Sequence, residues 1–101
     1  MLIYNITIKV SNSIAGEWLK WQREEHIPEI MGTSLFTEIK FFELLEPGEL
    51  DEPTFILQYF TDSRENYNRY INEYSHVLKE KARKKWGDNF IDFRSLMQTV
   101  H

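Results

Sequence analysis

The segment LIYNITIKV, from Leu2 to Val10, alternates between two kinds of side chain along its whole length. Its odd positions are polar apart from Ile3, whereas its even positions are apolar or aromatic: Leu2, Tyr4, Ile6, Ile8 and Val10. Because successive side chains of a β-strand point to opposite faces, this period of two predicts a strand with one well-buried face. Its two sides, one apolar and one mainly polar, serve as the reference for assigning the residues of the other strands to the two faces of the sheet.

After this strand, the residues SNS precede a segment with a helical period and are candidates for its N-cap. Ile14, Trp18 and Trp21 share one stripe of this helix, which we expect to begin near Ile14. Two strand-like segments follow at 34–45 and 54–61. Between them, the proline, glycine and acidic residues of EPGELDEP predict a surface turn.

A second helical segment extends to Gly87, which is placed as its C-cap, and Asp62 and Glu65 have the spacing of a capping box at its start. The final segment, NFIDFRSLMQTV, predicts a fourth strand. The order β-α-β-β-α-β is that of a ferredoxin-like α+β fold, a four-stranded antiparallel sheet with two helices on one face. With 101 residues, we expect a single domain over residues 1–101.

The alternation assigns each strand residue to one sheet face. The face expected under the helices carries a mostly apolar set: Tyr4, Ile6, Ile8, Ile39, Phe41, Leu57, Tyr59, Phe93 and Met97. The other face is mixed and carries Asp92 and Arg94 beside large apolar residues. Because such a patch would be exposed, we expect a homodimer through this face, with Arg94 in an ion pair between subunits. The apolar residues expected in the interface are Phe42, Ile56, Phe60 and Leu96.

Composition excludes several classes of function. The chain contains no cysteine, which rules out disulfides and thiol catalysis. A net charge of −4 argues against phosphate-driven binding of nucleic acid. No phosphate-binding or dinucleotide-binding glycine pattern is present, so we expect no cofactor of these kinds. Neither a signal peptide nor a membrane span is evident, and we expect a cytoplasmic protein that contacts no membrane.

His26 lies where the first helical pattern is interrupted. Pro28 cannot donate a backbone hydrogen bond, so we expect the helix to end or kink near His26. Glu24, Glu25 and Glu29, together with the helix C-terminus, are expected to raise the pKa of His26 and favour its charged form. Two interpretations stay open. His26 is either a general acid or base or polar anchor for a ligand, or it is a cap for the last carbonyls of the helix.

Four aromatic residues are candidates to line a ligand cavity between sheet and helices, where their polar atoms would orient a small molecule: Tyr4, Trp18, Trp21 and Tyr59. Plain core packing is the alternative for the same residues. His26 and Glu29 could both face one metal ion, but two ligands from one turn do not make a site, and we predict no metal.

Several segments resemble the dimeric α/β-barrel superfamily, and within it a small bacterial family of unknown function. The matching segments are IYNITIKV, WLKWQREEHIPEIMGTSLF, QYFTDSRENYNRYINEYS and KKWGDNFIDFRSLMQ. The resemblance implies two ferredoxin-like protomers that pack sheet to sheet. Related branches carry a similar His-x-Pro and include cofactor-independent monooxygenases, isomerases and dehydratase-like enzymes.

The resemblance leaves two functions open. The first is a cofactor-independent enzyme that holds a small organic molecule between sheet and helices and uses His26. The second is a non-catalytic dimeric module for ligand sensing or protein interaction, in which His26 only caps the first helix.

Overall fold

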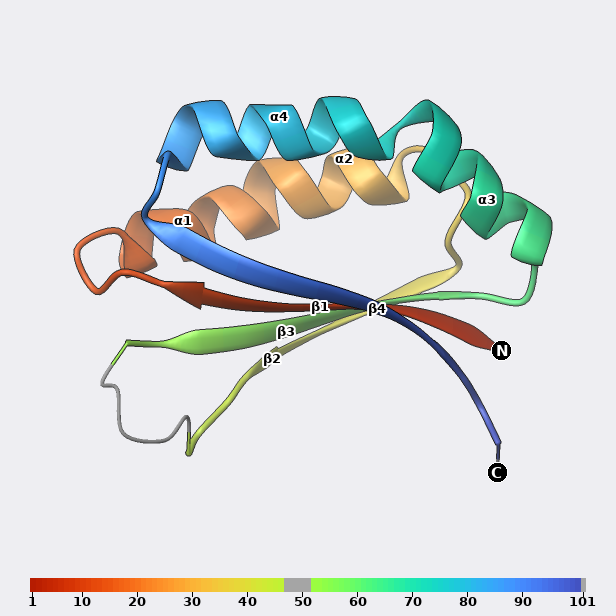
Figure 1. The fold of residues 1–101 in the computed structure, drawn as a ribbon, viewed down its shortest axis with the longest axis horizontal. Helices are drawn as coiled ribbons and strands as arrows, with labels where there is room; N and C mark the ends of the chain where they lie inside the picture. Colours follow the sequence, from red (N-terminus) through yellow and green to blue (C-terminus); the bar gives the residue numbers. More distant parts are fainter. Residues whose placement is uncertain (47–51, 101) are drawn as a thin grey trace.

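A computed structural model describes residues 1–46 and 52–100 of the protein. Its elements, in chain order, are β1 (Leu2–Val10), α1 (Ala15–Trp21), η1 (Gln22–His26), α2 (Ile27–Met31), β2 (Glu38–Glu43), β3 (Thr54–Thr61), α3 (Arg64–Glu73), α4 (Ser75–Trp86) and β4 (Phe90–Gln98). The strands form one antiparallel sheet in the order β2-β3-β1-β4, and the helices lie together on one side of it (Figure 1). The predicted ferredoxin-like fold is confirmed.

Only one face of the sheet is covered by helices. Figure 1 shows the helices above the sheet and no helix below it. The face under the helices is called here the helix side, and the other face is called the open face. Apolar side chains project from the open face, and Phe42, Ile91 and Phe93 are 45%, 60% and 72% exposed.

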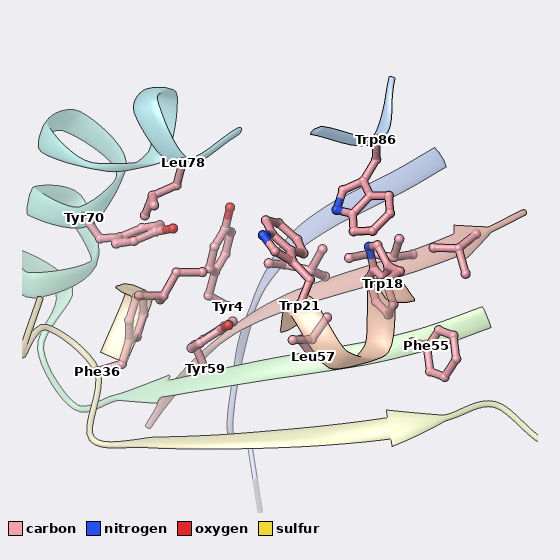
Figure 2. Packing of buried hydrophobic residues seen from close by; sticks show 14 of the residues in the cluster. Tyr4, Trp18, Trp21, Phe36, Phe55, Leu57, Tyr59, Tyr70, Leu78 and Trp86 are labelled. Carbon is pink, nitrogen blue, oxygen red and sulfur yellow. The ribbon is translucent and has the colours of Figure 1, made fainter. Parts of the chain in front are cut away.

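The core on the helix side is built largely from aromatic rings (Figure 2). Trp18 and Phe55 stack with ring centroids 5.1 Å apart, and Tyr4 contacts both Phe36 and Tyr70. Trp18 and Tyr59 are almost completely buried. Such rings bury large areas, so this layer accounts for much of the hydrophobic stabilisation of the sheet–helix interface.

The face assigned to β4 from the sequence is wrong. In the register of the sheet, Tyr4 pairs with Leu96, Ile6 with Arg94 and Ile8 with Asp92. Directly paired residues share a face, so Asp92, Arg94 and Leu96 lie on the helix side. The expectation that Arg94 and Leu96 belong to the uncovered face is therefore corrected, and the reverse correction applies to Phe93 and Met97. Phe42, Ile56 and Phe60 do lie on the open face.

The helix ends also differ from the expectation in part. Ile14 is the N-cap of α1 and makes no side-chain cap, so SNS does not cap this helix. Ser63, not Asp62, caps α3, and its Oγ accepts from the Asn66 N–H at 3.0 Å. Gly87 is the C-cap of α4 with φ +59°, as predicted, a conformation that glycine adopts easily. Most of the predicted turn EPGELDEP lies outside the described residues.

Candidate functional site

A small cavity lies between the sheet and the first helical segment. Its volume is about 20 Å³, enough for one water molecule or one group of that size. Polar side chains reach it from both layers: Gln22 and His26 from η1, Tyr59 from β3, and Asp92 and Arg94 from β4. Of the four aromatic residues predicted to line a cavity, Trp18, Trp21 and Tyr59 do so. Tyr4 is not among the lining residues and packs in the neighbouring aromatic cluster.

A π-turn brings His26 to this cavity. The N–H of Ile27 donates to the carbonyl of Gln22, five residues earlier, and the segment Gln22–His26 is a π-helix. This spacing places Trp21 and His26 over one another, with ring centroids 4.5 Å apart and an interplanar angle of 22°. Pro28 then lies in the first turn of α2, where its missing N–H costs little.

The helix therefore does not end at His26, and the interpretation of His26 as a helix cap is wrong. His26 makes no side-chain cap, and the backbone continues directly into α2. The π-turn also shifts the buried stripe by one residue. With a uniform α-helical period, Trp18 and Trp21 would be followed on the inner face by Glu25 and Glu29. After the shift those glutamates face outward, and Ile30 is buried.

Three buried polar atoms around the cavity have no hydrogen-bond partner: Gln22 Oε1, His26 Nδ1 and Tyr59 OH. Among the described residues, the other such atom is Trp86 Nε1, whose ring packs edge-on against Trp21. Buried polar groups in folded proteins are almost always paired, and each unpaired one costs about 1–3 kcal/mol. Three residues with such atoms line one cavity, which has room for one polar group.

Asp92 and Arg94 form an ion pair in the cavity wall. Arg94 Nη1 lies 2.8 Å from Asp92 Oδ2, and their side chains are 27% and 17% exposed. The two residues are two apart on one strand and so project from the same face. Because each charge largely neutralises the other, the pair can be half-buried without a further counter-ion.

The pKa of His26 is lowered to about 4, mainly because burial disfavours the imidazolium. Glu29 opposes this shift, whereas Arg94 and Lys81 reinforce it. The expectation of a raised pKa and a charged His26 is therefore wrong, and at neutral pH the imidazole is uncharged. Burial raises the pKa of the Tyr59 hydroxyl, with smaller contributions from Tyr70 and Tyr4, so this phenol remains protonated.

The site therefore presents uncharged groups that both donate and accept. The Tyr59 hydroxyl and the Gln22 amide each do so, and a neutral His26 does one or the other according to its tautomer. Nothing in residues 1–46 and 52–100 assembles three His, Asp or Glu side chains as metal ligands. What this arrangement can hold is one neutral oxygen-bearing group, with His26 as a proton acceptor beside it.

Sequence reasoning found His26 but missed three of its neighbours. Asp92 and Arg94 were assigned to the wrong face, and Gln22 was not singled out. The available signal for Gln22 was its place beside Trp21, as a polar residue next to an aromatic stripe. Asp92 and Arg94 fall on the correct face when the residues of β4 are assigned to the two sheet faces in the opposite way.

In the part of the chain that the structure describes, none of the helices has the length and apolar character required to cross a membrane. Comparison with curated proteins gives no match.

Solved structures of similar fold cover nearly the whole chain. An ethyl tert-butyl ether D (EthD) family protein from Bacillus halodurans is 14% identical, with a TM-score of 0.69 over 99% of this chain and 100% of that one. A dimeric ferredoxin-like protein from an uncultured marine organism is 15% identical, with a TM-score of 0.68 over 100% and 96%. SnoaB, a cofactor-independent oxygenase from Streptomyces nogalater, is 9% identical, with a TM-score of 0.67 over 99% and 94%.

At these identities the likeness shows the fold alone, and that fold is ferredoxin-like. A family model described as a domain of unknown function, DUF4286, matches residues 1–100. The chain belongs to the DUF4286 family.

Proposed function

We propose that this protein is a homodimer in which each subunit binds a small organic molecule between its sheet and its helices. The observation that carries the proposal is that Gln22, His26 and Tyr59, each with a buried polar atom that has no partner among the described residues, line one cavity. A core that served packing alone would have no reason to leave three such atoms unpaired at one place.

The chemistry of these groups defines what the ligand presents. Because all three are uncharged at neutral pH, they favour a neutral group over an anion. Arg94 offers little net positive charge to an anion, since Asp92 Oδ2 lies 2.8 Å from its Nη1 and offsets that charge. A hydroxyl both donates and accepts, and it has the size of the water that a volume of about 20 Å³ admits. The ligand therefore inserts a hydroxyl.

The remainder of the ligand must lie outside this volume. Asp92 and Arg94 are the charged and partly exposed portion of the wall, whereas Trp18 and Tyr59 are almost completely buried. The ligand enters beside the ion pair, and its apolar part rests against neighbouring rings, of which Trp21 and Phe90 line the cavity.

The same geometry supports proton transfer without a cofactor. A neutral His26 Nδ1 can accept the proton of the inserted hydroxyl, and the Tyr59 O–H can donate a hydrogen bond to the oxygen that becomes negative. With a pKa of about 4, His26 is a weak base, so it takes the proton only where that oxyanion is stabilised. The similar fold of a cofactor-independent oxygenase agrees with such chemistry.

The homodimer is proposed to form through the open face. Phe42, Ile56 and Phe60 lie there with Phe93, which is 72% exposed. Exposed apolar area of this kind marks association surfaces. A protein of similar fold over the whole chain is a dimeric ferredoxin-like protein.

Binding is tested by NMR titration with three matched probes: phenol, anisole and benzoate. Phenol donates and accepts, anisole only accepts, and benzoate is an anion. We expect phenol to shift the Trp21 indole resonance and the His26 ring resonances, and the other two probes to leave them unchanged. In Tyr59→Phe, phenol binding should weaken about tenfold, the worth of one hydrogen bond in a buried site.

Tyr74→Phe is the matched control, because Tyr74 lies at the junction of α3 and α4 and is partly exposed. Phenol should bind this variant as it binds the wild type. Equal binding of all three probes, or none of any, would overturn the proposed ligand chemistry.

A further inference from the structure

The open face carries one complete row of polar residues. Along it, Lys40 of β2 pairs with Gln58 of β3, Gln58 pairs with Asn5 of β1, and Asn5 pairs with Ser95 of β4. This polar row crosses all the strands at right angles to them. Asn5 and Gln58 form its centre, since they belong to the two inner strands of the sheet.

Apolar residues dominate the rows on either side. One neighbouring row contains Phe42, Ile56, Thr7 and Phe93, and the other contains Glu38, Phe60, Ile3 and Met97. The open face is therefore striped, with a polar line between two mainly apolar lines. Its few charged side chains, among them Lys40 and Glu38 on the edge strand β2, carry both signs and form no block that would repel an identical face.

The centre of the polar row is tied together within the subunit but is not saturated. Gln58 Nε2 donates to Asn5 Oδ1 at 3.2 Å, and Asn5 Nδ2 lies 3.4 Å from Thr7 Oγ1. A primary amide has two N–H donors and a two-lone-pair oxygen, so both amides keep free bonding capacity. The second N–H of each amide and the Gln58 oxygen remain free to bond outside the subunit.

We propose that Asn5 and Gln58 lie at the two-fold axis of the sheet-to-sheet homodimer, opposite the same two residues of the partner, and fix its register. This inference rests on the proposed homodimer. In a two-fold interface a patch meets its own copy, so amides that both donate and accept are self-complementary there.

Any other register would be penalised. If one sheet slid by one row, the amides would meet an apolar row and lose water without gaining partners, which is costly for buried polar groups. Apolar rows alone would not discriminate between registers, because contacts between hydrocarbon side chains are non-directional. The polar row thus specifies one alignment, whereas the flanking rows supply the association energy.

The test is Asn5→Asp, with Ser95→Asp as the control on the same row. The new carboxylate still accepts from Gln58 Nε2, so the subunit should keep its far-UV circular dichroism. At the two-fold axis, however, the carboxylate of one subunit faces the same carboxylate of the partner, and the two negative charges repel each other. We expect the dimer dissociation constant of Asn5→Asp at pH 7 to rise at least about tenfold, and that of Ser95→Asp, at the end of the row, to change several-fold less.

The outcomes separate the two proposals. A wild-type monomer at micromolar concentration would overturn the homodimer and this inference with it. A wild-type dimer with equal effects of the two substitutions, or with none from Asn5→Asp, would overturn the inference alone.

Register is tested separately by Asn5→Leu combined with Gln58→Leu. We expect this variant to remain dimeric, as measured by light scattering, but to give more than one set of amide resonances because its register is no longer unique. One set of resonances, or a monomer, would overturn the role of the polar row in register. Thr54→Val, a polar-to-apolar change on the same face outside the row, should keep a single set.

Discussion

The two faces of the sheet treat polar side chains in opposite ways. On the helix side, Gln22, His26 and Tyr59 leave buried atoms without partners around a cavity of about 20 Å³. On the open face, Gln58 and Asn5 are hydrogen-bonded to each other within the subunit. Both faces are otherwise rich in apolar residues, so the faces differ in whether their polar groups have hydrogen-bond partners within the subunit.

This difference suits the two faces to different partners, a small group on the helix side and an extended surface on the open face. Unpaired atoms in an enclosed volume call for a single small group, because nothing larger reaches them without displacing a wall. Paired amides on a broad, partly exposed surface suit an extended surface of the same kind. The comparison thus separates the proposed ligand site from the proposed association surface, and both use the same strands.

The largest expected effect is the loss of a ring from the helix side. Trp18→Ala should lower the free energy of unfolding by about 3–5 kcal/mol, because Trp18 is 1% exposed and packs on Phe55 and Phe41. Chemical denaturation followed by circular dichroism measures it. A loss below 1 kcal/mol would mean that this layer is loosely packed and that the contrast between the faces is overstated.

The next effect is a dependence of stability on pH that originates at His26. The folded pKa is about 4 against an ordinary value of 6.5, so between these values the unfolded state binds the extra proton. Stability from this group is complete above about pH 6.5 and falls as the pH approaches 4, by about 3 kcal/mol in all. Chemical denaturation of the wild type and of His26→Gln at several pH values gives the contribution of His26, as the difference between their two pH profiles.

The control for this pH series is His76→Gln. The His76 side chain is 87% exposed on α4, so the variant should keep the wild-type pH profile. If His26→Gln lost as much stability on acidification as the wild type, the pH dependence would not originate at His26.

A smaller effect is expected from the open face. Phe93→Ala should change the free energy of unfolding of the isolated subunit by less than about 0.5 kcal/mol, because the ring is 72% exposed. The dimer dissociation constant should rise about tenfold, since interfaces concentrate their energy in such aromatic residues. Sedimentation equilibrium gives the second value. A large loss of subunit stability without a change in association would reverse the roles assigned to the two faces.

The smallest effect is expected from Tyr59→Phe in the absence of ligand. The hydroxyl makes no hydrogen bond to residues 1–46 or 52–100, so its removal should leave the free energy of unfolding unchanged or raise it by up to about 1 kcal/mol. Thermal denaturation of the purified protein measures the difference. A loss of more than 1 kcal/mol would show that the hydroxyl already has a partner, such as a tightly held water.

Most of the fold could be predicted from the sequence because β1 and β3 have one clearly apolar face each. The phase of β4 could not, because Phe90, Ile91, Phe93 and Leu96 make both of its faces apolar. The polar pair Asp92 and Arg94 then suggested the exposed face. In the structure their mutual neutralisation lets them line the cavity instead.

The site was predicted in part for a different reason. His26 was identified from its neighbours in sequence, but its charge state was not, because three glutamates nearby suggested a raised pKa. Of the three, only Glu29 raises the pKa of His26, and burial against Trp21 outweighs it. Burial depends on the π-turn, which local charge patterns do not reveal.

The π-turn has a consequence for how the chain tolerates length changes. Gln22–His26 behaves as a one-residue insertion in an otherwise α-helical segment, because its hydrogen bond spans five residues instead of four. After a single deletion within it, the helix would be regular, and Ile30 would lie about 20° from Trp18 around the helix axis and stay on the buried face. A further insertion would instead rotate everything that follows by about 100° relative to Trp21. The segment should therefore tolerate the loss of one residue better than the gain of one.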